Sequence, residues 1–340
     1  MTQAQAMPDP QPIWQIMTGF QQSAAFKTAI ELELFTKIGE GNKTVADIAK
    51  ACGAAEKGIR VLADVFTVHG FLTKADENYS LSDMSAAFLD KNSRTYLGSA
   101  VEFIMSDGQK RGYEDLTNAV RSGGSQIQGE ASMDPDSPMW VTFAKAMMPM
   151  MFPAAMGIAG NLGFEKDQKL KVLDIAAGHG IFGIMVAQAY PNAEIHAVDW
   201  ANVLTVATEN ANRMGVGDRH HLIPGSAFDV EFGEDYDVVL VTNFLHHFDA
   251  ETCTKFMSKV YAALKPGGKA ITLEFIPNDD RVSPPGEALF ALVMLAATPG
   301  GDAYTFNELK KMCEDAGFSS NVHVPMPPMP QHLVISTKEG

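Results

Sequence analysis

The segment Val172-Leu-Asp-Ile-Ala-Ala-Gly-His-Gly-Ile-Phe-Gly183 decides the fold of the second half of the chain. Its first four residues have the apolar character of a buried strand, and the glycines that follow fit the spacing G-x-G-x-x-G. That spacing is typical of a turn between a strand and a helix, where the backbone approaches a ligand closely because no Cβ intervenes. Taken alone, the pattern does not decide which ligand binds.

Apolar strand-like runs alternate with helical segments on the C-terminal side of this turn. The expected strands are residues 172–175, 194–198, 236–242 and 269–275, with helices ending near 190, 214 and 264. Alternation of this kind predicts an α/β fold with a parallel sheet and right-handed crossovers. Two final strands, 321–324 and 332–337, are joined by a link too short for a crossover helix, so we expect them to be antiparallel.

The N-terminal part has a different, mainly helical pattern. Thr44 is placed to cap a short helix that ends at Gly53, and a second helix covers residues 56–69. Strand-like residues then flank the turn 76–78, as in a hairpin. Helix, turn, helix and hairpin predict a winged helix. This motif can bind DNA, but the second helix has no excess of basic residues, which favours a packing or dimerisation module.

The composition limits the classes of partner and location. A formal net charge of −15 disfavours nucleic acids and anionic membranes. The three cysteines, Cys52, Cys253 and Cys313, have no metal-ligand spacing and form no plausible disulfide framework. We expect no signal peptide at the N-terminus and no apolar run near the roughly 20 residues that span a bilayer. These features predict a cytoplasmic protein of two domains.

Two acidic residues near the glycine turn favour one ligand over another. Asp174 lies at the end of its strand, where a carboxylate would repel a pyrophosphate but attract an ammonium group. Asp199 ends the next strand and can accept hydrogen bonds from both hydroxyls of a ribose. NAD enzymes use an acid at that second place too, so Asp174 is the residue that argues against a dinucleotide.

With Leu264-Lys-Pro-Gly-Gly-Lys269 added to these residues, the stretch 171–337 resembles a class I S-adenosylmethionine-dependent methyltransferase. The front half resembles the winged-helix dimerisation domain of the small-molecule O-methyltransferases, a group that includes plant caffeate and animal hydroxyindole enzymes. The resemblance implies a Rossmann-like sheet of seven strands, S-adenosylmethionine as cofactor with S-adenosylhomocysteine as product, and a homodimer. It divides the chain into a dimerisation domain (12–95), a helical bridge (96–160) and a methyltransferase domain (161–340).

The resemblance also assigns cofactor-binding residues. Asp174, Gly178 and Gly180 match the methionine-binding motif. The remaining candidates are Asp199 and Trp200 at the ribose, Ser226, Ala227 and Phe228 in the adenine loop, and Thr242 and Asn243 under the cofactor. Ser226 stands where the family usually has Asp, so Asp229 is an alternative contact to the adenine, and Ala176 replaces a further glycine.

The same resemblance implies a general base. His246 matches the catalytic histidine of the plant enzymes, Glu274 matches the acid that orients it, and His247 is expected to be structural. A histidine suits this task because an ordinary imidazole side chain is mostly neutral at pH 7 and can then accept a proton. The second Glu of the plant enzymes is replaced here by Ala303. Asp302 could compensate, or the methyl acceptor could be carbon or nitrogen. We expect no metal.

A set of apolar residues on helices is expected to line the pocket for the acceptor. They are Met105, Trp140, Phe143, Met147, Met151, Phe290, Met294 and Leu295. Such a lining suits a small aromatic or polyketide-like molecule. Two other functions remain open from the sequence, namely a winged-helix regulator that senses a ligand and a relative that keeps the cofactor with altered chemistry.

Overall fold

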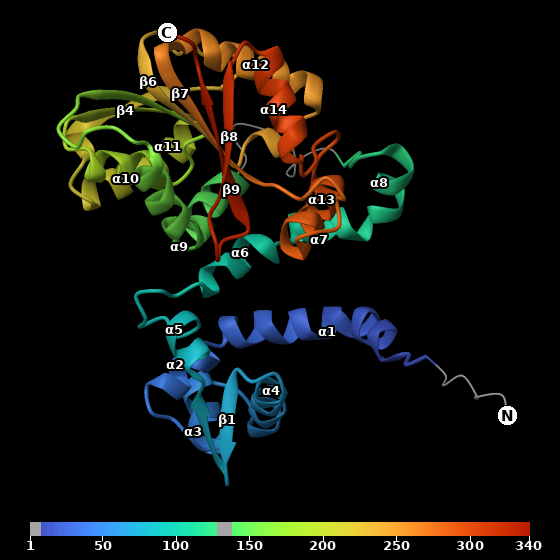
Figure 1. Ribbon diagram of the computed structural model, residues 1–340. Coiled ribbons are helices and arrows are strands. Elements are labelled where there is room, and N and C mark those ends of the chain that lie inside the picture. The colour runs from blue at the N-terminus through green and yellow to red at the C-terminus, as the bar shows by residue number, and fades with distance from the viewer. Residues whose placement is uncertain (1–7, 128–137) are drawn as a thin grey trace, which may run out of the picture. The chain divides into compact units, whose positions relative to one another are not determined.

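The computed structural model describes residues 8–127 and 138–340, shown in Figure 1. The chain divides into two compact units, Met1–Val101 and Glu102–Gly340. Each unit is described separately below.

The first unit contains the predicted helix–turn–helix and hairpin. Its elements are α1 (Gln11–Glu31), α2 (Leu34–Gly39), α3 (Val45–Cys52), α4 (Glu56–Val68), β1 (Leu72–Ala75), β2 (Asn78–Leu81), α5 (Asp83–Phe88) and the 3₁₀ turn η1 (Gly98–Ala100). The Thr44 hydroxyl accepts a hydrogen bond from the Asp47 amide, and Gly53 ends α3 with a φ of +61°. The strands β1 and β2 pair antiparallel.

The second unit is built on a seven-stranded sheet. Its strands are β3 (Leu170–Ile175), β4 (Ala193–Asp199), β5 (His220–Pro224), β6 (Tyr236–Thr242), β7 (Leu264–Phe275), β8 (Ser320–Pro325) and β9 (Gln331–Thr337). The order is β5-β4-β3-β6-β7-β9-β8, and β9 runs antiparallel to both β7 and β8. The predicted parallel sheet and antiparallel final pair are therefore confirmed. The edge strand β5 was missed, because its polar residues are mostly exposed and lack the apolar run of a buried strand.

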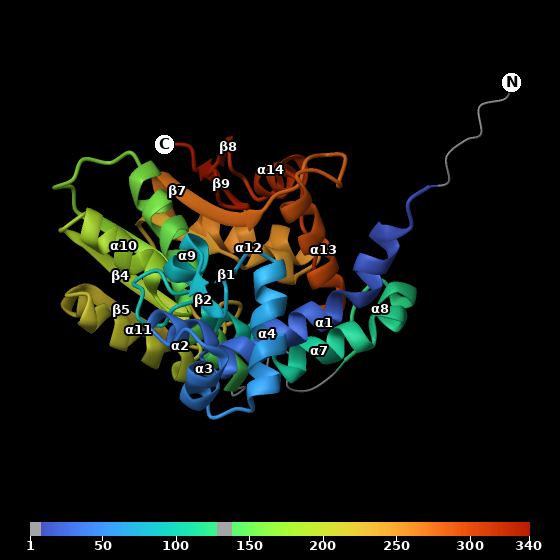
Figure 2. The same ribbon diagram turned by 90° about the horizontal axis from the view of Figure 1, so that it is seen from below.

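Helices cover both faces of this sheet, as Figures 1 and 2 show. One face packs against α9 (Pro138–Asn161) and α10 (Ile181–Ala189), and the opposite face packs against α12 (Ala250–Ala263) and α14 (Phe306–Asp315). The remaining helical elements are α6 (Val101–Ile104), α7 (Asp107–Glu114), α8 (Leu116–Ser122), α11 (Ala201–Arg213), α13 (Pro285–Ala297), η2 (Gly217–Arg219) and η3 (Leu245–His247). Residues 128–137 of the predicted helical bridge lie outside the described residues.

The helix α9 corrects one expectation from the sequence. By length and composition it is apolar enough to cross a membrane, although Lys145 interrupts its apolar residues. One such helix is weak evidence for a span, because a core helix of a globular domain passes the same test. Here Ala154, Ala155 and Ile158 are fully buried against the sheet and α10.

The register of the parallel strands brings their carboxyl ends to one edge. Ile175 of β3 pairs with Val198 of β4 and with Val241 of β6, and Thr242 of β6 pairs with Leu273 of β7. The residues that follow each strand therefore meet at this edge. In a doubly wound sheet this is where ligands bind.

The turn after β3 contains a strained alanine. Ala176 has a φ of +51°, a left-handed conformation that costs a residue with a Cβ about 1–2 kcal/mol. We expect Ala176→Gly to raise the free energy of unfolding by about 0.5–1 kcal/mol, since the greater flexibility of unfolded glycine offsets part of the relief. Urea unfolding of the ligand-free protein measures this change in the free energy of unfolding.

The neighbouring Ala177 is the matched control, because it is buried but has no positive φ. Ala177→Gly is expected to lower the free energy of unfolding by about 1 kcal/mol. Equal destabilisation by both substitutions would contradict strain at Ala176.

Candidate functional site

A cavity opens at the carboxyl edge of the sheet. It encloses about 900 Å³, including its open mouth, and its wall combines the glycine turn, the ends of β4 and β6, and the first half of α9. Most of its wall residues are apolar, and Asp199 is the one acidic residue among the described wall residues. The volume is that of a pocket for a small organic ligand.

The glycine turn needs its glycines for two different reasons. Gly178 has a φ of +58°, and its amide donates a hydrogen bond to Oδ2 of Asp199 at 2.8 Å. Gly180 also has a positive φ, and a Cβ there would lie 2.9 Å from the Cβ of Ala207. Gly178 therefore shapes the turn beside the cavity, whereas Gly180 lets α10 pack closely against α11.

Asp174 lies beneath the cavity and is fully buried. One carboxylate oxygen accepts a hydrogen bond from the Gly183 amide at 3.0 Å, and the other oxygen has no partner among the described residues. A Cβ on Gly183 would lie 2.8 Å from this carboxylate, so the third glycine of the turn makes room for it. Burial, with a smaller effect of Asp199, raises the pKa of Asp174 to about 8.

Asp199 lies in the cavity wall, with both carboxylate oxygens held by the backbone. The Gly178 amide donates to one oxygen at 2.8 Å and the Trp200 amide donates to the other at 2.7 Å. Burial outweighs these two hydrogen bonds and raises the pKa of Asp199 to about 6. Each oxygen keeps a second lone pair with which it can accept another hydrogen bond.

The loop after β5 supplies another part of the wall through Ser226, Ala227 and Phe228. The Lys259 ammonium on α12 donates to three carbonyls of this loop, those of Ala227 (3.0 Å), Phe228 (2.9 Å) and Val230 (2.7 Å). Asp229 is exposed and does not line the cavity. Sequence reasoning missed Lys259, because nothing in its neighbourhood on α12 indicates contact with a loop some 30 residues earlier.

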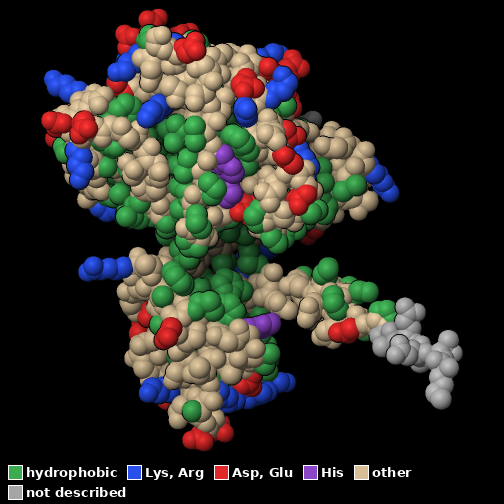
Figure 3. Space-filling model, in the orientation of Figure 1, with side chains coloured by type: hydrophobic (Ala, Val, Ile, Leu, Met, Phe, Trp, Pro, Cys, Tyr) green, Lys and Arg blue, Asp and Glu red, His purple; other side chains and the backbone are tan. Residues whose placement is uncertain are grey.

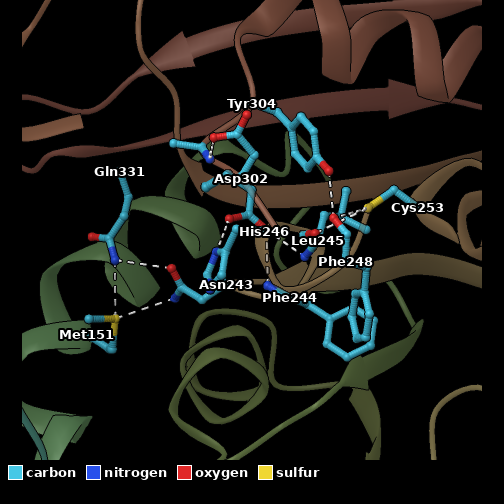
Figure 4. Close-up of polar contacts among 12 residues, drawn as sticks. Met151, Asn243, Phe244, Leu245, His246, Phe248, Cys253, Asp302, Tyr304 and Gln331 are labelled. Atoms are coloured by element: carbon cyan, nitrogen blue, oxygen red, sulfur yellow. Dashed lines mark hydrogen bonds and ion pairs between the residues drawn. The ribbon is translucent and has the colours of Figure 1, made fainter. Parts of the chain in front are cut away.

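Thr242 and Asn243 line the cavity at the end of β6. The Asn243 amide group donates to the Met151 sulfur at 3.6 Å, and the buried Gln331 donates both to that sulfur and to Oδ1 of Asn243, at 3.5 Å and 3.3 Å. Figure 4 shows these three side chains together on one side of His246. Gln331 was missed as well, since it comes from β9 at the far end of the chain.

The predicted pair of His246 and Glu274 is brought together. Nδ1 of His246 is bonded to Oε2 of Glu274, and Oε1 of Glu274 accepts hydrogen bonds from the amides of Phe244 (3.0 Å) and Leu245 (2.8 Å). Both side chains are almost completely buried. Among the described residues nothing hydrogen-bonds to Nε2 of His246. The Phe290 ring lies 4.9 Å from the His246 ring and stacks on Phe275.

His247 rather than His246 is part of the cavity wall. Its ring lies edge to face with the Trp140 ring, at 6.2 Å between centroids. Burial, and to a smaller degree the neighbouring His246, lowers the pKa of His247 well below its ordinary value. His247 is therefore a neutral ring at neutral pH.

The loop that carries Ala303 packs against the histidine turn. A Cβ on Gly301 would lie 2.1 Å from the His246 carbonyl, so the two segments touch through their backbones. Ala303 is buried, and the Asp302 carboxylate pairs with Arg281 at 3.1 Å. Asp302 is thus engaged by Arg281 and makes no hydrogen bond to His246 among the described residues.

Only some of the residues predicted to line the acceptor pocket lie at the cavity. Trp140, Phe143 and Met151 line the cavity, and Phe290 lies beside His246. Met294 is buried, while Met105, Met147 and Leu295 are half-buried, and these four lie outside the cavity wall. Wall residues that the sequence did not assign to ligand binding are Ala177, His179, Phe182, Val203, Phe244 and Phe248, together with His247, which was expected to be structural.

Comparison with known proteins identifies this arrangement. Residues 162–319 match the model of the O-methyltransferase domain, and residues 14–91 match that of the O-methyltransferase dimerisation domain. A Nostoc punctiforme protein, provisionally described as an O-methyltransferase, has a crystal structure that is 48% identical with a TM-score of 0.93, covering 98% of this chain and 100% of that one.

Two curated relatives are more distant. The S-adenosyl-L-methionine-dependent methyl transferase PigF from Serratia sp. is 26% identical over 95% of this chain and 94% of its own. The 3-hydroxy-5-methyl-1-naphthoate 3-O-methyltransferase from Streptomyces sahachiroi is 24% identical over 89% of this chain and 88% of its own. The fold and these matches define an S-adenosylmethionine-dependent methyltransferase. Within that class, the chain belongs to the O-methyltransferase family.

The cavity fits the family's cofactor, S-adenosylmethionine. Three buried polar atoms at or beneath the cavity have no hydrogen-bond partner in the described parts of the chain. They are Oδ1 of Asp174, Oγ1 of Thr242 and Nε1 of Trp140. Unpaired buried polar atoms cost about 1–3 kcal/mol each, so a polar ligand that bonds to them is stabilised. The ribose and amino-acid parts of this cofactor carry suitable donors and acceptors.

The buried Asp174 gives a prediction about stability and pH. Its pKa of about 8 in the folded protein lies above its ordinary 3.8, so the native state binds the proton more tightly than the unfolded state. The contribution of Asp174 to stability therefore falls as the pH rises from about 4 to 8. We expect the unfolding free energy of Asp174→Asn, minus that of the wild type, to increase over this range.

Urea unfolding of both ligand-free proteins at several pH values measures that difference. Subtracting the wild type removes the contributions of the other titrating groups, including the buried histidines. A difference that stays constant between pH 4 and 8 would show that Asp174 is ionised in the native protein.

Proposed function

We propose that this protein methylates a hydroxyl group of a small aromatic or polyketide-like acceptor, with His246 as the general base and Glu274 as the residue that orients it. The observation that carries the proposal is the buried His246–Glu274 pair, placed at the same sheet edge as the cofactor cavity. The acceptor class is supported by the aromatic wall of the cavity and by the naphthoate enzyme among the relatives.

The hydrogen bonds around Glu274 assign the proton on His246. Glu274 already accepts from two backbone amides, and an ionised carboxylate has only acceptors. Nδ1 of His246 must then carry the proton that it donates to Glu274, which leaves a lone pair on Nε2. Neutral His246 in this tautomer can take a proton from an acceptor hydroxyl.

The reaction then needs little beyond alignment and this proton transfer. The cofactor supplies an electrophilic methyl group on a positively charged sulfur. Nε2 of His246 would take the proton of the acceptor hydroxyl as its oxygen is methylated. The Glu274 carboxylate stabilises the imidazolium that forms. The products are the methyl ether and S-adenosylhomocysteine.

The cofactor roles are those that the family resemblance implies, and the cavity lining supports them. Asp174 would hold the ammonium of the methionyl part, and Gly178 and Gly180 shape the turn around it. Asp199 accepts from the ribose hydroxyls, with Trp200 beside it. The adenine side is formed by Ser226, Ala227 and Phe228, and the floor by Thr242 and Asn243. The N-terminal unit would form a homodimer with its twin, as its match to a dimerisation domain suggests.

The position of Ala303 limits the mechanism to one orienting acid. Asp302 is paired with Arg281, so among the described residues Glu274 is the acid that holds the His246 ring. Three donors converge on the Glu274 carboxylate, which fixes it without help from a second acid. Methylation at carbon or nitrogen is the alternative outcome if no hydroxyl is modified.

The proposed function is tested with labelled S-adenosylmethionine and a panel of phenols, indoles and aromatic polyketides. We expect cofactor-dependent labelling of at least one hydroxylated member and none of its O-methylated counterpart. Labelling that survives blocking of the hydroxyl would place the methyl group on carbon or nitrogen. Failure of the wild-type protein to bind S-adenosylmethionine in calorimetry would overturn the proposal.

The base is tested by His246→Ala. We expect kcat to fall by about 10²–10⁴-fold, while the Kd for S-adenosylmethionine changes by no more than about twofold, because His246 lies outside the cavity wall. Glu274→Gln should lower kcat by about 10-fold or more, since the amide cannot both accept from the backbone and orient the ring.

The control for this series is His221→Ala. His221 is half exposed on β5 and pairs with Glu194, away from the cavity wall. Its removal should leave kcat and Kd unchanged. If His246→Ala reduced cofactor affinity as much as turnover, the histidine would be structural.

A further inference from the structure

The glycine turn contains one polar side chain that the proposed mechanism does not use. His179 lies between Gly178 and Gly180, is only 3% exposed, and forms part of the cavity wall. The residue is thus almost completely buried at the wall of the cavity. The methionyl end of the cofactor is assigned to the same turn.

The hydrogen bonds of His179 determine which nitrogen is the donor. Nδ1 accepts a hydrogen bond from the Ile181 amide at 3.2 Å. The proton of the neutral ring must therefore be on Nε2, which has no partner among the residues that the structure describes. Burial lowers the pKa of His179 to about 4, so the ring stays neutral and keeps this single donor at physiological pH.

The position of His179 is fixed without any ligand. Its carbonyl accepts from the Asn210 side-chain amide at 2.8 Å, and Arg213 donates to the other end of that amide at 2.7 Å. The ring packs against Phe182, with 5.5 Å between centroids. An N–H donor held in place and left unpaired suits a ligand acceptor, because little freedom is lost on binding.

One side of the glycine turn favours a cation, and the other side favours an anion. Asp174 supplies a carboxylate with one unpaired oxygen, which suits a cation. The Nε2–H of His179 suits an anion, and it lies beside the positive end of the nine-residue helix α10. The Ile181 and Gly183 amides at the start of this helix already donate to His179 and Asp174. A free α-amino acid carries an ammonium and a carboxylate on one carbon, and so matches both.

We propose that Nε2–H of His179 donates a hydrogen bond to the α-carboxylate of the methionyl part of the cofactor, and that this contact selects cofactors that keep the carboxylate. The inference rests on the cofactor site of the proposed function but not on His246 or on the identity of the acceptor. His179 is thus a cofactor-binding residue and has no part in proton transfer.

The test uses one ligand that keeps the carboxylate and one that lacks it. Each ligand is compared between wild type and variant, so the methyl sulfonium of the second ligand, which is the same in both proteins, cancels. Calorimetry gives the Kd of S-adenosylhomocysteine and of decarboxylated S-adenosylmethionine for the wild type and for His179→Phe, which keeps a ring against Phe182 but has no donor. A hydrogen bond to a charged group supports a loss of about 10–100-fold for S-adenosylhomocysteine. The Kd of the decarboxylated ligand should change by less than about twofold.

Two further variants complete the test. His179→Gln places an amide donor near the position of Nε2, and should recover part of the affinity for S-adenosylhomocysteine alone. His221→Ala, far from the turn, should change neither Kd. The ratio of the two Kd values within one variant does not depend on the fraction of folded protein, so a less stable variant still gives an answer.

Equal losses for both ligands would overturn the proposal and show that His179 only shapes the turn. An unchanged Kd for S-adenosylhomocysteine would overturn it too, because then no bond to the carboxylate is lost. If the wild type bound neither ligand, the proposed function itself would fail, an outcome distinct from both of these.

Discussion

The parallel pairing of β3 with both β4 and β6 is the constraint on which the site depends. Because Ile175 is in register with Val198 on one side and Val241 on the other, three chain segments leave the sheet at the same level. The turn after β3, Asp199 after β4 and Thr242 at the end of β6 then surround one cavity. A slip of one residue in any of these strands would turn its side chains to the opposite face and remove its share of the wall.

Buried carboxylates organise the turns at this edge. Asp174, Asp199 and Glu274 each end or nearly end a strand, and each accepts hydrogen bonds from backbone amides in the segments that follow β3, β4 or β6. Desolvation disfavours such charges, and the raised pKa values of Asp174 and Asp199 show that the backbone donors offset it only in part. The ligand-free site therefore holds acceptor groups that gain most when positively charged or hydrogen-bonding partners arrive.

Residues from both faces of the sheet bound the cavity. Met151 and Phe182 belong to the core under α9 and α10, and Phe244 and Phe248 belong to or pack against the core under α12 and α14. Histidines outside the site show how residue type alone misleads. On the face seen in Figure 3, histidine side chains are exposed next to hydrophobic ones. His323 of β8 and His332 of β9 bond to each other at 2.8 Å. Only the contacts distinguish such a pair from His246.

The strand and helix order, the parallel sheet, the glycine turn and the family could be predicted from the sequence, because they depend on periodicity and on residues close together in the chain. The same pattern of strands also predicted that Asp174, Asp199 and Thr242 lie at one edge of the sheet. The strand β5, the Lys259 contacts with the loop, Gln331 beside Asn243 and the engagement of Asp302 by Arg281 could not be predicted. These depend on packing between distant segments, where many side chains compete for one partner and only the tertiary structure decides which one reaches it.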